Sequence, residues 1–496
     1  MKIKEILTLE ILILFLVILL GFTLRLYKID SPIADWHSWR QADTAAVTRN
    51  FITQGFNPFF PKGDDMSGIA EKPISNTGRL RFVEFPVYNI FVYPFYLVFG
   101  VNEMYHRLVS VIFSLGSIIF LYLITRKYSG RGIGLLSAFI FSVLPFNVFF
   151  SRTTLPEPTL VFFSLGMMYF VDRWIWEEKR NLYWFGLIFT MVAFLIKPWA
   201  LFFAVPLIYS MYKKEGKIFP IQKKYVIFAL FAIIPFILWR EWILQTPEGI
   251  PASNWLLNGD GIRFRPAFWW WIVSERIGRE ILGVTGAFLF FLGFIIRPKS
   301  GSPREAGNFF FHIFALSLFS YFAIFATGNV RHDYYQIVFV PVASVFVALG
   351  TINLVKGIPD FIPRLFTIPL ALTFLLFTFF FTWTQVKELY KINNPPIIEA
   401  GKKADQILPK EAIVVAPYSG DTAFLYQINR RGFPVTALPL AELVSDYGVT
   451  HYISVNRDDK TNWVLRHFKI LEDNPKFVIA DLTKLEKPFE QEDPEP

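Results

Sequence analysis

The chain has 496 residues, of which 53% are hydrophobic, 18% aromatic and only 18% charged. Globular domains carry nearer a quarter charged residues, so this composition excludes a soluble enzyme, a disordered chain and a fibrous protein, and it predicts a polytopic membrane protein. The net charge of +9 is expected on cytoplasmic loops and against anionic lipid, not on nucleic acid. The absence of Cys excludes disulfides and thiolate metal sites.

The first apolar run covers residues 6–26, and it lacks a small-residue cleavage site, which favours a retained membrane helix over a signal peptide. A polar stretch follows over residues 27–83, and it opens with the helical-looking segment WHSWRQADTAAVTRNF. Residues 84–100 are aromatic and interrupted by two prolines. We expect them to form a helix in the membrane interface, with a short span as the alternative.

Ten further apolar runs bring the expected number of spans to about eleven. They lie near residues 103–125, 133–150, 157–175, 183–197, 199–212, 225–244, 281–297, 307–327, 334–354 and 364–384.

The basic residues of the loops give the orientation, because short cytoplasmic loops carry an excess of Lys and Arg. With the N-terminus in the cytoplasm, the inner loops contain Arg126, Lys127, Arg131, Arg173, Lys179, Arg180, Lys213, Lys214, Lys217, Lys223, Lys224, Arg297, Lys299 and Arg304. The short outer connections contain only Arg152, Lys197 and Arg331. This bias supports an interfacial segment at 84–100, because a span there would invert every later loop.

An odd number of spans places the C-terminus outside the cytoplasm. From about residue 387 the long apolar runs stop, and strand-like pieces appear in AIVVAPYSG, THYISVN and KFVIADLTKL, with LAELVSDYG as a helix. We therefore predict an all-α membrane domain over residues 1–386, with a first outer loop at 27–102, and a small extracytoplasmic α/β domain over residues 387–496.

The predicted topology collects unusual polar residues at the outer ends of the spans. A charge at membrane depth needs a partner or water, so one polar site at the outer membrane surface would explain the whole group. Its members are Asp35, His37, Arg40, Asp43, Glu84, Arg152, Glu157, Lys197, Arg331, His332, Asp333, Tyr334 and Tyr335.

A helix through WHSWRQADTAAV would place His37, Arg40 and Asp43 three residues apart, with Arg40 and Asp43 on one face. A carboxylate beside an arginine stays ionised near neutral pH and can act as a general base. The alternative is a surface helix pair of little energetic value.

Each of the other groups also has a structural alternative. Glu157 would favourably place a charge at a helix N-terminus, and Lys197 would extend to the interface. The functional hypothesis is that Lys197 contacts a lipid phosphate. His332 and Asp333 form either a local hydrogen-bonded pair or, with His37, metal ligands.

Four motifs together resemble membrane glycosyltransferases of the GT-C class, closest to protein O-mannosyltransferases and lipid A aminoarabinose transferases. The motifs are HSWRQADTAAVTRNF, RFVEFPVYNIFVYPFYLVFG followed by NEMYHRLVS, SRTTLPEPTLVFF and RHDYYQIVFVP. The resemblance covers roughly residues 1–390, and it extends to the placement of the C-terminal domain.

The resemblance implies transfer of a hexosyl or pentosyl group from a polyprenyl-phosphate sugar to a protein, lipid or glycan acceptor outside the cytoplasmic membrane. This transfer is expected to need no cofactor, because the phosphate that leaves the sugar is already anionic. The alternative is that the reaction uses a divalent metal. A lipid or glycan transporter or flippase without transferase activity is the rival hypothesis, but it would need charges at mid-bilayer in repeated broken helices.

The resemblance also assigns roles to residues. In the family, an acidic residue of the first outer loop is the catalytic base or orients the acceptor, and here we expect Asp43, with Asp35 as second choice. Glu84 matches a position that Lys-Pro follows in the aminoarabinose enzymes, whereas Phe85 and Pro86 follow here. Substrate-binding roles are expected for His37, Arg40, Glu84, Glu157, Lys197, Arg331, His332, Asp333 and Tyr335.

Overall fold

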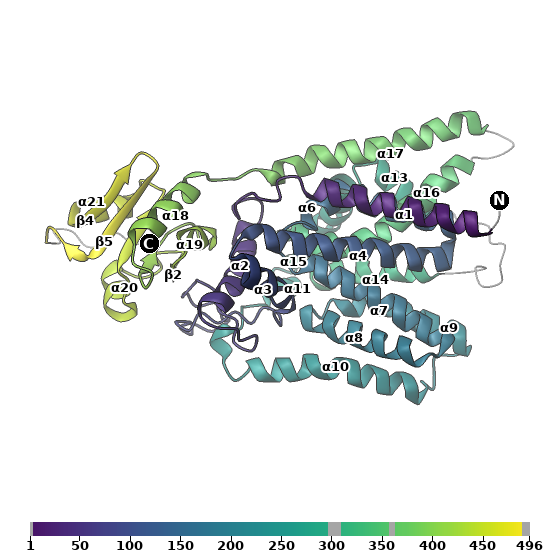
Figure 1. Ribbon diagram of the computed structural model, residues 1–496, viewed down its shortest axis with the longest axis horizontal. Helices are drawn as coiled ribbons and strands as arrows, with labels where there is room; N and C mark the ends of the chain where they lie inside the picture. The colour runs from purple at the N-terminus through teal and green to yellow at the C-terminus, as the bar shows by residue number, and fades with distance from the viewer. Residues whose placement is uncertain (1–2, 296–308, 357–362, 489–496) are drawn as a thin grey trace. The chain divides into compact units, whose positions relative to one another are not determined.

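The computed structural model describes residues 3–295, 309–356 and 363–488, which are mostly helical (Figure 1). They form two compact units. The first contains the described residues of the ranges 1–29, 107–242 and 253–389, and the second contains those of the ranges 30–106, 243–252 and 390–496. The predicted first outer loop therefore groups with the C-terminal region, not with the helices that flank it in the chain.

Each of the eleven predicted spans contains a helix. These helices are α1 (Ile3–Arg25), α4 (Glu103–Ser129), α5 (Arg131–Val143), α7 (Glu157–Glu177), α8 (Arg180–Ile196), α9 (Ala200–Glu215), α10 (Lys223–Ile243), α13 (Thr285–Ile295), α14 (Phe310–Ile324), α16 (Val340–Lys356) and α17 (Arg364–Val386). The cationic loop residues Arg297, Lys299 and Arg304 lie outside the described residues.

Shorter helical segments connect these helices. They are α6 (Pro145–Phe150), α11 (Trp255–Asn258), η2 (Ile262–Phe264), α12 (Pro266–Trp270), the π-helix η3 (Trp271–Ile281), α15 (Ala326–Arg331), η4 (Asp333–Phe339) and η5 (Lys387–Tyr390). Prolines set several boundaries: Pro156 and Pro158 flank the first residue of α7, and Pro198 follows the end of α8.

Within the described residues, five helices are long and apolar enough to cross a membrane, or six if the bent pair Pro266–Ile281 and Thr285–Ile295 forms one span. Four shorter apolar helices accompany them: α3 (Val87–Phe99), α5, α8 and α14. The chain is thus a multi-pass membrane protein, while the total of eleven spans and their orientation stay predictions.

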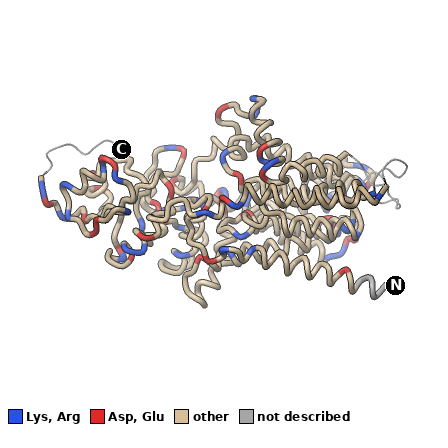
Figure 2. The backbone as a smooth tube through the Cα atoms, turned by 90° about the horizontal axis from the view of Figure 1, so that it is seen from above, with Lys and Arg blue, Asp and Glu red and all other residues tan. Residues whose placement is uncertain are grey.

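The outer helices of the first unit expose apolar side chains. In the most apolar 18-residue stretch of α1 and of α10, only 22% of the residues are buried, whereas 83% are buried in that of the segment Asp333–Lys356. Exposed Leu, Ile and Phe side chains on a water-facing surface would be unfavourable, whereas lipid tails solvate them. Figure 2 shows few charged residues along the middles of the long helices and most of them near the ends, as a bilayer requires.

Two glycines allow α13 and α16 to pack closely. A Cβ atom added at Gly350 would lie 1.8 Å from the carbonyl oxygen of Leu289, and one added at Gly293 would lie 2.0 Å from that of Phe346. Helices in lipid associate through such close contacts between small residues.

We therefore expect Gly350→Val to destabilise the helix bundle by about 1–3 kcal/mol or more, because the two backbones must separate. The thermal unfolding midpoint of the purified protein in detergent measures this loss. The matched control is Gly132→Ala, since an added Cβ there meets no atom within 4 Å. Equal midpoints for both variants would contradict the packing argument.

The second unit combines the first loop with the C-terminal region. Its helices are α2 (Ser38–Thr53), α3 (Val87–Phe99), α18 (Pro396–Ile407), α19 (Ala423–Ile428), α20 (Leu440–Tyr447) and α21 (Asp459–His467), with the turn η1 (Pro247–Gly249). Helix α3 has 13 residues, and at 1.5 Å per residue it is too short to cross a hydrocarbon core of about 30 Å. Its length agrees with the expected interfacial position.

A five-stranded sheet lies in this unit, in the order β2-β1-β3-β5-β4. The strands are β1 (Ile413–Val415), β2 (Arg431–Phe433), β3 (His451–Ser454), β4 (Phe468–Asn474) and β5 (Phe477–Leu485). Strand β1 pairs in parallel with β2 and β3, whereas β5 pairs antiparallel with β3 and β4. The three predicted strand segments and the helix at 440–447 are confirmed, so the predicted fold class is correct.

Helix α2 has two different faces. Ala42, Ala45 and Ala46 are buried in an apolar core that also contains Phe424 of α19 and residues of the sheet. Small side chains on this face allow α19 to approach α2 closely. The opposite face of α2 carries polar side chains, and it borders the cavities described below.

Candidate active site

The Asp43 carboxylate is held by donors from two distant parts of the chain. Its Oδ1 atom lies 2.9 Å from a guanidinium nitrogen of Arg81 and accepts a hydrogen bond of 2.8 Å from the Thr422 hydroxyl. Asp43 Oδ2 makes no hydrogen bond to any described residue. One oxygen of Asp43 is therefore fixed, and the other remains able to accept a proton.

Arg40, one turn before Asp43, forms a second ion pair. Its Nη2 atom donates to both carboxylate oxygens of Glu84, at 2.6 and 2.8 Å. Arg40 and Asp43 are both buried, with exposed fractions of 5% and 6%. The alternative of a surface helix pair is therefore wrong, because both groups are withdrawn from water and each is bound to a residue of the segment 81–84.

A small cavity joins these groups within the second unit. It holds about 20 Å³ and is lined by Arg40, Asp43, Thr44, Val47, Pro61, Arg81, Val83, Glu84, Pro86 and Asn89. Three of the predicted site residues, Arg40, Asp43 and Glu84, thus share one cavity. Arg81 is a lining residue that the sequence interpretation missed.

Asp35 and His37 lie elsewhere in this unit. Asp35 is buried, and its Oδ1 atom accepts a hydrogen bond of 2.6 Å from the Gln41 side chain. His37 is expected three residues before Arg40 in the same helix, but it is the N-cap of α2, in the left-handed conformation with φ of 56°. Helix α2 begins at Ser38, so the three-residue spacing from His37 does not continue the helical turn.

The segment 421–423 brings a further carboxylate to the start of α2. Ser38 Oγ donates to Asp421 Oδ2 at 2.7 Å, and the Ala423 amide donates to Asp421 Oδ1 at 2.7 Å. Burial raises the pKa of Asp421 above its usual value, and the Asp43 charge adds to the increase. Burial also raises the pKa of Asp65, whereas its partner Arg81 lowers it. Additional negative charge near Asp43 is therefore unfavourable. Arg81 offsets part of the existing charge, because it pairs with both Asp43 and Asp65.

In the first unit, Glu157 and Lys197 form a buried ion pair. Glu157 is the first residue of α7 and Lys197 directly follows α8. The Lys197 ammonium lies 4.3 Å from the ring centre of Trp199 and 5.3 Å from that of Tyr335. The interpretation that Lys197 extends to the interface is wrong, because its side chain is 9% exposed and bound to Glu157.

The turn 331–335 borders this pair. The Tyr334 ring centre lies 6.0 Å from the Lys197 ammonium, and the His332 ring lies 5.2 Å from the Tyr335 ring. Asp333 is buried, 3.7 Å from a guanidinium nitrogen of Arg276. Arg331 is exposed and its guanidinium lies 5.1 Å from the ring centre of Trp255.

The predicted residues therefore form two groups. Arg40, Asp43 and Glu84 meet in the second unit, whereas Glu157, Lys197, His332 and Tyr335 meet in the first. Their convergence in one reaction chamber stays a prediction. Within the described ranges, no three His, Asp or Glu side chains gather as metal ligands would.

Sequence reasoning missed Arg81, Asp65, Asp421 and Thr422. Arg81 is the first residue of the motif RFVEFPVYNIFVYPFYLVFG, whose aromatic residues give the stronger sequence signal. Thr422 has no local signal, because it stands 379 positions from Asp43 in the chain and is an ordinary residue of a loop.

Comparison with known families agrees with the expected class. Residues 84–239 match the family described as dolichyl-phosphate-mannose-protein mannosyltransferase. A stretch of 80 residues is 41% identical to an uncharacterized protein of Aquifex aeolicus (strain VF5), and it covers 16% of this chain and 19% of that protein. The chain thus matches about a fifth of that relative's length.

Two solved structures share the fold. ArnT from Cupriavidus metallidurans, bound to undecaprenyl phosphate, matches with a TM-score of 0.64 and 11% identity, over 97% of this chain and 98% of that chain. The archaeal oligosaccharyltransferase AglB from Archaeoglobus fulgidus, in complex with an inhibitory peptide and a dolichol-phosphate, matches with a TM-score of 0.56 and 11% identity, over 95% of this chain and 74% of that chain. Residues 84–239 thus resemble that mannosyltransferase family, and the chain shares the fold of ArnT and AglB.

Proposed function

We propose that this protein transfers a hexosyl or pentosyl group from a polyprenyl-phosphate donor to an acceptor on the extracytoplasmic side of the cytoplasmic membrane. The structures of ArnT and AglB hold undecaprenyl phosphate and dolichol-phosphate, which supports a lipid-phosphate donor. A protein, a lipid and a glycan each remain candidates for the acceptor. The same similarities favour a transferase over the transporter alternative.

The observation that carries this proposal is the environment of Asp43. It lines a cavity, one of its oxygens is fixed by Arg81 and Thr422, and the other makes no hydrogen bond to a described residue. Asp35 is instead bonded to Gln41. A general base must be open to its substrate, so we assign this role to Asp43 in preference to Asp35.

The reaction is a direct displacement at the anomeric carbon of the sugar. The acceptor nucleophile forms the new bond to this carbon as the bond to the phosphate oxygen breaks, and Asp43 takes the proton of the nucleophile. The leaving lipid phosphate keeps the bonding electrons, and a nearby cation stabilises the added charge. Arg331 suits this contact better than Lys197, because Glu157 already neutralises Lys197.

Arg81 and Arg40 position the reacting groups. Arg81 bridges Asp43 and Asp65, at 2.9 and 3.0 Å, so it holds the base in a fixed orientation. Arg40 fixes Glu84 in the cavity wall, where the Glu84 carboxylate can accept a hydrogen bond from a sugar hydroxyl.

A transfer assay with radiolabelled donors tests this function. Purified full-length protein in detergent is incubated with polyprenyl-phosphate hexoses and pentoses, and with candidate acceptors. We expect donor cleavage with the label on an acceptor, and equal rates after treatment with EDTA, because the leaving group is already charged and the mechanism requires no metal. Donor binding without cleavage, for every acceptor and with added divalent metals, would instead support a transporter.

A further inference from the structure

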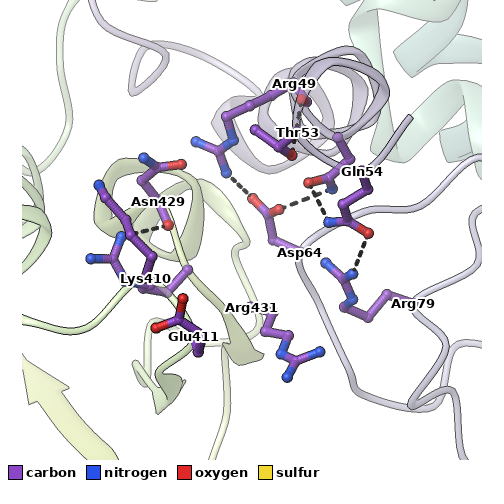
Figure 3. A pocket seen from close by; sticks show the side chains of 11 residues that line it. Arg49, Thr53, Gln54, Asp64, Arg79, Lys410, Glu411, Asn429 and Arg431 are labelled. Atoms are coloured by element: carbon purple, nitrogen blue, oxygen red, sulfur yellow. Dashed lines mark hydrogen bonds and ion pairs between the residues drawn. The ribbon is translucent and has the colours of Figure 1, made fainter. Parts of the chain in front are cut away.

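A second, larger cavity lies in the second unit, and it is strongly basic. It holds about 660 Å³ and opens between the C-terminal half of α2, the loop after it and the segment 410–431 (Figure 3). Its lining residues are Arg49, Asn50, Thr53, Gln54, Asp64, Arg79, Lys410, Glu411, Asn429, Arg430 and Arg431. Five of these are cations and two are carboxylates.

One wall of this basic cavity is a continuous hydrogen-bonded row of side chains. Arg49 is paired with Asp64, and Asn50 donates to Asp64 Oδ1 at 3.3 Å. Gln54 donates to Asn50 at 3.0 Å and accepts from Arg79 at 2.8 Å. Because each side chain is held by the next, the guanidinium groups of Arg49 and Arg79 are fixed before any ligand arrives.

The opposite wall comes from the C-terminal region, as Figure 3 shows. Arg430 is fully buried and bound to Asp405 and to backbone carbonyls. Lys410 is exposed and pairs with Asp405 at 2.7 Å. Arg431 is exposed, and its side chain makes neither a hydrogen bond nor an ion pair with a described residue. Arg431 is therefore available to a ligand.

The cavity has an excess of positive charge. Arg49 neutralises Asp64, which leaves Glu411 as the one other carboxylate among the lining residues. The four other cations of the lining therefore outnumber it. Burial lowers the pKa of Arg79, and repulsion from the Arg431 and Arg49 charges lowers it further. The Asp64 carboxylate has the opposite effect, but the net shift is downward. Arg residues recognise phosphate oxygens well, because the planar guanidinium can donate two parallel hydrogen bonds.

The basic cavity and the Asp43 cavity border the same face of α2. Asn50 follows Asp43 by seven residues, which is about two helical turns, or about 10.5 Å along the axis. The loop also connects them, because Asp64 pairs with Arg49 in the basic cavity while Asp65 pairs with Arg81 beside Asp43. Along the axis of α2, Asn50 in the wall of the basic cavity thus lies about 10 Å from the proposed base.

We propose that this basic cavity binds a phosphate group carried by the acceptor, with Arg79 and Arg431 as the main contacts. The proposal rests on the proposed function, since it names a part of the acceptor for the same base. The phosphate anchors the acceptor, and the nucleophile reaches the Asp43 cavity along the face of α2. The source of the phosphate is either a lipid headgroup or a soluble molecule.

Binding to the full-length protein in detergent tests this inference directly. The probes are inorganic pyrophosphate, phosphatidic acid in mixed micelles and, as an uncharged lipid, diacylglycerol, each followed by calorimetric titration. We expect pyrophosphate and phosphatidic acid to bind, with affinities that fall as salt increases. The double variant Arg79→Gln with Arg431→Gln should bind both about tenfold or more weakly, since charge-assisted hydrogen bonds are lost.

The matched control removes the same charge elsewhere in this unit. Lys402 and Lys469 are exposed and line none of the cavities described here, so Lys402→Gln with Lys469→Gln should bind as the wild type does. Tighter binding of phosphatidic acid than of pyrophosphate identifies a lipid source, and the reverse identifies a soluble one. Equal affinities for both double variants, or no binding of either phosphate probe by the wild type, overturn the inference. These measurements require no turnover, so their failure is distinguishable from a failure of sugar transfer.

Discussion

Replacing Asp43 with Asn will abolish sugar transfer and leave the protein folded. The amide keeps the shape of the side chain, and its oxygen can still accept from Thr422 and Arg81, but it cannot take a proton from the acceptor. Loss of a general base typically costs about 10²–10⁴ in rate. Arg81 keeps a carboxylate partner in Asp65 at 3.0 Å, so no buried cation is left alone. The rate of label transfer and the thermal unfolding midpoint measure the two effects.

Asp35→Asn is the matched control for this result. Its oxygen can still accept the hydrogen bond from Gln41, and we expect transfer close to that of the wild type. Transfer at the wild-type rate by Asp43→Asn, together with an inactive Asp35→Asn, would move the base to Asp35. Transfer by both variants would mean that neither carboxylate is the base.

Replacing Lys197 with Met will strongly destabilise the first unit. Glu157 is 1% exposed, and its Oε2 atom has no hydrogen-bond partner among the described residues, so Lys197 is the group that neutralises its charge. Removing one member of a buried ion pair typically costs about 3–5 kcal/mol, because the other charge remains buried. Thermal unfolding in detergent should show a lowered midpoint.

The double variant Lys197→Met with Glu157→Gln separates this charge effect from lost packing. It removes both charges, so we expect it to be more stable than Lys197→Met alone. If the change in midpoint of the double variant equals the sum of the changes in Lys197→Met and Glu157→Gln, the ion pair does not stabilise the protein through charge. The stabilisation would then come from packing of Lys197 against the rings of Trp199 and Tyr335.

The position of Asp43 shows how far sequence reasoning reaches at the candidate site. The motif HSWRQADTAAV identified a helix and selected Arg40 and Asp43. It suggested that they pair with each other, whereas Arg40 binds Glu84 and Asp43 binds Arg81. Helical spacing describes neighbours on the same helix, and it contains nothing about a loop that folds back across the helix.

The assignment of the first loop is a second example. Its sequence between two spans suggested that it belongs with the membrane helices. The alanines of α2 instead form part of the core that contains Phe424 of α19 and strands of the C-terminal sheet. Small apolar side chains on a helix face allow another element to pack closely, but they do not determine which element it is. The alanines of α2 therefore could not identify α19 and the C-terminal sheet as their partners.

The sequence by itself determined the membrane class, the positions of the helices, three strands of the C-terminal sheet and the carboxylates to consider. Hydrophobic runs and strand patterns are local, and a bilayer makes them decisive because each span must satisfy its own backbone hydrogen bonds. Only the tertiary structure decided the partners of Asp43 and the basic cavity, whose walls come from residues 49–79 and 410–431. Such contacts join distant segments, and their energy depends on burial and geometry that no local pattern records.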